Sequence, residues 1–124
     1  MSGQIASPTI IQSLASLVSR PVSEAVQERA KLHLIDWLGC AIAKAAIRVR
    51  KDYASSNAFY LGVLGNILEM DDVDKRAILH PAPSIIPAAL AMCLEDSERL
   101  NRLPEAIVSG YETTIRLGRA TGPG

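Results

Sequence analysis

The 124-residue sequence contains few aromatic side chains, only 4% of the total, so a hydrophobic core has to be built from Ala, Leu, Ile and Val. It has no excess of either charge, because 13 Lys and Arg balance 13 Asp and Glu, whereas nucleic-acid-binding domains normally carry a basic excess. It also lacks an uncharged apolar run of about 18 residues, the length that a membrane-spanning helix needs. We therefore expect no nucleic-acid partner and no membrane insertion.

Cysteine is scarce as well. Cys40 and Cys93 lie far apart and form no Cys-x-x-Cys pair, so we expect two reduced, buried thiols, with a disulfide as the alternative. The N-terminal segment 1–8 has no basic stretch followed by an apolar run, which argues against a secretory signal. These features predict a cytoplasmic protein.

Apolar residues recur at intervals of three or four through most of the chain, and no segment alternates as a strand does. We expect an all-α fold, a single helical domain over 1–124 that forms a compact bundle of about five helices. The expected helices start after a cap at Ser7, at Ser23 (reaching towards Val49), at Ser55, at Ser84 with Pro87 in the first turn, and near Pro104 (ending at Gly118), with a polar connection over 96–102.

A basic cluster lies near the end of the second predicted helix, at Lys44, Arg48, Arg50 and Lys51. Cations at this position complement the negative end of the helix dipole. The cluster is therefore read either as a solvated helix end or as an anion-binding patch. In the third helix, Gly62 and Gly65 weaken the helix, so we expect them to allow a close approach of a neighbouring element.

The segment whose side chains are best suited to catalysis is an acidic loop. Glu69, Asp71, Asp72 and Asp74 fall within six residues, and His80 follows. Carboxylates beside an imidazole are suitable for proton transfer to or from carbon or oxygen. The alternative is that the loop is a solvated turn without chemistry.

The sequence does not match the known metal-binding or cofactor-binding motifs. Asp72-Val73-Asp74 begins like a calcium loop, but its fifth position is Arg76 and the required glycine is missing. One histidine near acids does not make a zinc site, and His33 is expected to be structural or exposed. The chain also has no dinucleotide-binding, Walker A or Gly-x-Ser-x-Gly motif, so we expect no metal and no cofactor.

Four segments carry a family pattern, in this order: 36–41 (Asp-Trp-Leu-Gly-Cys-Ala), 65–73 with 79–81 (Gly-Asn-Ile-Leu-Glu-Met-Asp-Asp-Val and Leu-His-Pro), 85–91 (Ile-Ile-Pro-Ala-Ala-Leu-Ala), and 105–112 with 115–120 (Glu-Ala-Ile-Val-Ser-Gly-Tyr-Glu and Ile-Arg-Leu-Gly-Arg-Ala). Together they resemble the MmgE/PrpD family. That family includes 2-methylcitrate dehydratase, cis-aconitate decarboxylase and an iminodisuccinate epimerase.

The resemblance implies part of the helical N-terminal domain of a two-domain lyase or isomerase. Such enzymes hold a small polycarboxylate between the helical domain and an α/β domain. A proton is removed beside a carboxylate, and water or CO₂ is then lost, or the carbon is reprotonated on its other face. We expect the chain to be a truncated form without the α/β domain, internally shortened between Ile42 and Ser55.

The resemblance also implies roles for individual residues. The expected catalytic residues are His80, Asp71, Asp72 and Glu69, and the expected substrate-binding residues are Arg76, Pro81 and Ser84. Three positions depart from the family pattern: Glu69 replaces an aspartate, Val73 stands where many relatives carry a threonine, and Ala82 stands where the family often has Gly or Ser.

A non-catalytic role is the competing hypothesis. A helical face that a second domain would cover becomes exposed in a truncated relative, and such a face favours association. On this hypothesis the chain is a helical association module, forming a homo-oligomer or binding a partner chain.

Overall fold

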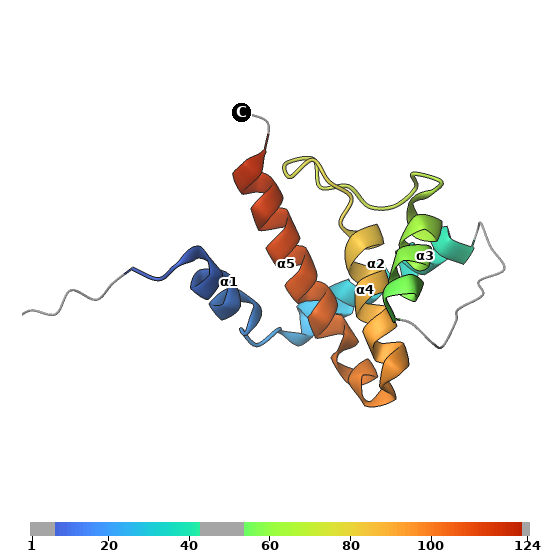
Figure 1. Cartoon of the computed structure of the whole chain (residues 1–124), viewed down its shortest axis with the longest axis horizontal. Helices are drawn as coiled ribbons and strands as arrows, with labels where there is room; N and C mark the ends of the chain where they lie inside the picture. Colours follow the sequence, from blue (N-terminus) through green and yellow to red (C-terminus); the bar gives the residue numbers. More distant parts are fainter. Residues whose placement is uncertain (1–6, 43–53, 123–124) are drawn as a thin grey trace, which may run out of the picture.

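The computed structural model describes residues 7–42 and 54–122 (Figure 1). Within these ranges the chain is all-α and has no strand, only an isolated antiparallel bridge between Asp74 and Leu79. The elements are α1 (Ile10–Val18), α2 (Glu24–Ile42), α3 (Ala54–Asn66), α4 (Ala82–Glu95), the 3₁₀ helix η1 (Ser97–Arg102) and α5 (Leu103–Thr121). The predicted fold class is confirmed. The predicted extension of the second helix to Val49, and the basic cluster at 44–51, lie outside the described residues.

The start of α1 differs from the prediction. Thr9, not Ser7, caps the helix, because the Thr9 side chain accepts the Gln12 N–H while the Gln12 side chain accepts the Thr9 N–H. This reciprocal capping box satisfies two donors at once, which a cap at Ser7 could not do from its position two residues earlier.

The start of α4 differs for a tertiary reason. The helix begins at Ala82, two residues before the predicted Ser84, and the Ala82 N–H donates to Asp72 Oδ1 at 3.0 Å. Pro87 therefore lies inside the helix rather than in its first turn. Because Pro87 has no N–H, the Pro83 carbonyl lacks its usual intrahelical donor. Gly62 of α3 packs against this carbonyl, and an added Cβ at Gly62 would lie 2.8 Å from its oxygen.

Two further differences follow from contacts. Residues 97–102, predicted as an irregular connection, form η1, which Asp96 caps by accepting the Glu98 N–H. The last helix continues past Gly118 to Thr121. Gly118 allows a close approach rather than ending the helix, because an added Cβ would lie 2.7 Å from Leu79 Cδ2.

The core lies where α2, α4 and α5 meet. Trp37, Ile86 and Ile107 are almost completely buried there, one from each helix. Cys40 and Cys93 are buried and unpaired, as expected, and burial raises the pKa of both thiols. By contrast, α1 contacts only α5 among the helices and lies to one side of the others (Figure 1). No helix in the described part of the chain has the length and apolar character needed to cross a membrane.

The α2–α3 contact supports a test of the packing. Gly65→Ala adds a methyl group that overlaps the Trp37 indole and lies 2.8 Å from its Cδ1 atom. Because neither the buried ring nor the helix backbone can yield, we expect a loss of about 3 kcal/mol in unfolding free energy, measured by urea denaturation.

Gly39→Ala is the matched control, because an added Cβ at this position of α2 meets no atom within 4 Å. It should stabilise the protein by about 0.5–1 kcal/mol through helix propensity. Equal effects of the two substitutions would contradict this packing.

Candidate functional site

The loop between α3 and α4 is folded back on itself around Asp74. Asp74 Oδ1 accepts the N–H groups of Ala77 and Arg76 at 2.8 and 3.0 Å, and the backbones of Asp74 and Leu79 exchange two hydrogen bonds. Arg119 of α5 donates to Asp74 Oδ2 at 2.9 Å. The Ala77 N–H, helped by Arg119, lowers the pKa of Asp74. The turn is thereby fastened to α5.

His80 is held by a buried carboxylate. Its Nδ1 atom lies 2.8 Å from Asp71 Oδ2, and Asn66 donates to Asp71 Oδ1 at 3.2 Å. The Asp71 side chain is fully buried, whereas that of His80 is 40% exposed. Because an ionised carboxylate can only accept, this contact favours a proton on Nδ1, and in the neutral imidazole Nε2 then carries none.

The neighbouring Asp72 serves a different set of partners. Its Oδ2 atom accepts the Tyr111 hydroxyl of α5 at 2.6 Å and lies 3.5 Å from His33 Nδ1 of α2. Its Oδ1 atom caps α4 at Ala82. Burial, and secondly the hydrogen bond to Asp72, raises the pKa of Tyr111, so the phenol keeps its proton. This carboxylate therefore ties three helices together.

The structure brings some of the predicted site residues together and leaves others apart. His80 and Ser84 line one open hollow of about 540 Å³, together with Asn66 and apolar residues of α3. Pro81 is buried directly beside His80. Glu69 and Arg76 are exposed, and within the described residues neither side chain pairs with the Asp71–His80 unit. Glu69 has a positive φ of 50°, as does Ile78.

Sequence reasoning did not find Tyr111 and His33 as partners of the loop. Tyr111 reads as one more position on the apolar face of a helix, and His33 as a structural or exposed histidine. No local signal joins them to Asp72, because 39 residues separate Asp72 from Tyr111. Their rings also contact each other, with centroids 5.1 Å apart.

Comparison with models of protein families shows to which family the chain is related. Residues 45–124 match the model of the MmgE/PrpD N-terminal domain. The chain belongs to the MmgE/PrpD family. The matched range includes the whole loop, α4 and α5, but not the resembling segment at 36–41. Searches of curated proteins and of solved structures returned no match.

The loop of this family member offers no arrangement for a metal ion. Across residues 7–42 and 54–122, no group of three His, Cys, Asp or Glu side chains converges on one point. Both oxygens of Asp71 and of Asp72 are instead engaged by side-chain or backbone partners. The arrangement is suited to positioning an imidazole.

The Asp72–Tyr111 contact can be tested by removing one hydroxyl. Tyr111→Phe leaves a largely buried carboxylate oxygen without its shortest hydrogen bond, and should lower the free energy of unfolding by about 1.5–3 kcal/mol. Tyr60→Phe removes the same group from an exposed position on α3 and should leave stability unchanged. Urea denaturation of both variants checks this, and equal stabilities would contradict the role assigned to Tyr111.

Proposed function

We propose that the chain contributes the helical side of a lyase or isomerase site, in which His80 moves a proton beside a carboxylate of a small polycarboxylate. The substrate class follows the family, as with 2-methylcitrate or cis-aconitate. The observation that carries the proposal is the 2.8 Å contact between His80 Nδ1 and the fully buried Asp71. Asp71 acts as a positioning residue that presents Nε2 as the base.

The hollow beside His80 provides a place for the reacting carbon. Asn66 and Ser84 supply polar groups at its lining, and Phe59 and Val63 supply an apolar wall. A general base contributes to catalysis only within hydrogen-bond reach of the proton it removes. A substrate in this hollow would lie against the exposed side of the imidazole.

Substrate charge has to be neutralised from outside this hollow. None of its described lining residues is Lys or Arg, and a polyanion needs paired cations when it leaves water. Arg76, exposed on the same loop, is the nearest candidate by sequence. The remaining cations would come from another part of the protein or from a second chain, as the two-domain family organisation implies.

Carbon–hydrogen exchange tests the proposal at its first step. The full chain is incubated with 2-methylcitrate in D₂O, and the carbon-bound protons beside the carboxylates are followed by ¹H NMR. We expect exchange above the buffer rate, lowered about 100-fold or more in His80→Gln because the base is lost. Circular dichroism verifies that this variant is folded.

Glu69→Gln is the comparison, because the family pattern also places a carboxylate there. A larger loss in Glu69→Gln than in His80→Gln would show that the carboxylate is the base. Absence of exchange by the folded wild-type chain at high protein concentration would overturn the catalytic proposal.

Association is the second candidate function, and the outer face of α2 favours it. Leu32, Ile35 and Ile42 are each about 60% exposed there, at helical spacing on one side. We propose that this face pairs with a second copy of the chain, since an apolar stripe of this kind favours self-association.

Sedimentation equilibrium tests the association. We expect a dimer that Ile35→Glu converts to a monomer, whereas Glu98→Gln, a change at an exposed position of η1 away from this face, leaves the dimer intact. A wild-type monomer that binds no apolar dye would contradict this second proposal.

A further inference from the structure

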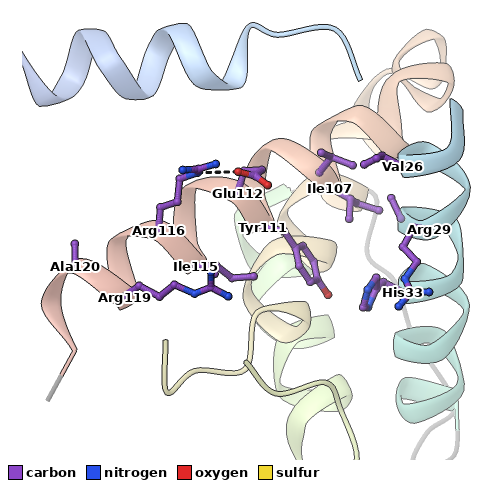
Figure 2. A pocket seen from close by; sticks show the side chains of 12 residues that line it. Val26, Arg29, His33, Ile107, Tyr111, Glu112, Ile115, Arg116, Arg119 and Ala120 are labelled. Carbon is purple, nitrogen blue, oxygen red and sulfur yellow. Dashed lines mark hydrogen bonds and ion pairs between the residues drawn. The ribbon is translucent and has the colours of Figure 1, made fainter. Parts of the chain in front are cut away.

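A second and larger hollow lies between α2 and α5, on the Tyr111 side of the loop (Figure 2). Its volume is about 730 Å³, within the usual range of small-molecule sites. It shares no lining residue with the His80 hollow. The adjacent residues Asp71 and Asp72 lie between the two hollows, since Asp71 bonds to His80 and Asp72 bonds to Tyr111.

The lining combines an apolar wall with cations. Aliphatic side chains form the wall, namely Val26, Ala30, Ile107, Val108, Ile115 and Ala120. Arg29 extends from α2 beside His33, whereas Arg119 extends from α5 on the far side of Tyr111 (Figure 2). An apolar hollow with cationic side chains at its edge fits a ligand that carries an anionic group on an apolar body.

The charges of the hollow leave one cation available. Arg116 pairs with Glu112, and one nitrogen of Arg119 pairs with Asp74. The carboxylate of Asp72, behind the rings, is already occupied by Tyr111 and Ala82. Among the described residues, Arg29 has no ion-pair partner. One anionic group placed beside Arg29 would thus be compensated.

We propose that this hollow is a binding site for an organic anion with a single carboxylate on an apolar body. The carboxylate binds Arg29, and the apolar body packs against the aliphatic wall. A compact polycarboxylate fits less well, since the wall offers its further charges no donors. The site is independent of the proposed chemistry at His80.

Octanoate is a suitable probe, because it has one carboxylate and an apolar chain. In a titration of the full chain followed by NMR, we expect saturable shifts of the His33 and Tyr111 ring signals. Octan-1-ol, which keeps the chain and lacks the charge, should bind about tenfold more weakly. Tricarballylate, which has three carboxylates on a short body, should also bind more weakly than octanoate.

Arg29→Gln and Lys31→Gln provide the matched pair of variants. Both remove one positive charge from α2, but Lys31 does not line the hollow and pairs with Glu28. Arg29→Gln should weaken octanoate binding about tenfold, and Lys31→Gln should leave it unchanged. The proposal is overturned if octanoate causes no saturable shift, if octan-1-ol or tricarballylate binds as tightly, or if the two variants weaken binding equally. His80→Gln should not affect binding, which separates this result from the test of catalysis.

Discussion

The structure depends on two adjacent carboxylates that face opposite ways from one loop. Placing Asp71 and Asp72 away from water is costly unless each oxygen is compensated. Asp71 obtains this from Asn66 and His80, and Asp72 from Ala82 and Tyr111. These bonds reach the end of α3, the start of α4 and the middle of α5. The loop can therefore adopt this path only when the helices are assembled around it.

The same constraint organises the two hollows. The Asp71 side chain fixes the imidazole that borders the hollow next to α3, and the Asp72 side chain fixes the phenol that borders the hollow between α2 and α5. Asp74 adds a third attachment through Arg119, at the far end of α5. The chemistry proposed for one hollow and the binding proposed for the other thus both involve side chains held by this loop.

The helices could be predicted from sequence because their signal is local. Apolar spacing over three to four residues marked all five α-helices, and the need for small residues at Gly62 and Gly65 was visible from their cost within a helix. Some boundaries were predicted wrongly, at the start of α1 because of a local capping box and elsewhere where distant residues make contact. At the start of α4, the Ala82 N–H bonds to Asp72, ten residues earlier, and Gly118 lies inside α5 where the helix packs closely against Leu79.

In the candidate site, too, the features with a local sequence signal could be predicted and those set by tertiary contacts could not. The acidic loop and His80 were recognisable from composition and family resemblance, whereas Tyr111 and His33 join the loop only through tertiary structure. The central claim, that Asp71 orients His80, is tested most directly by the tautomer of the neutral imidazole. Long-range ¹H–¹⁵N NMR correlations at alkaline pH distinguish the two ring nitrogens. We expect the proton on Nδ1 and none on Nε2, and a proton on Nε2 instead would contradict this orientation of His80.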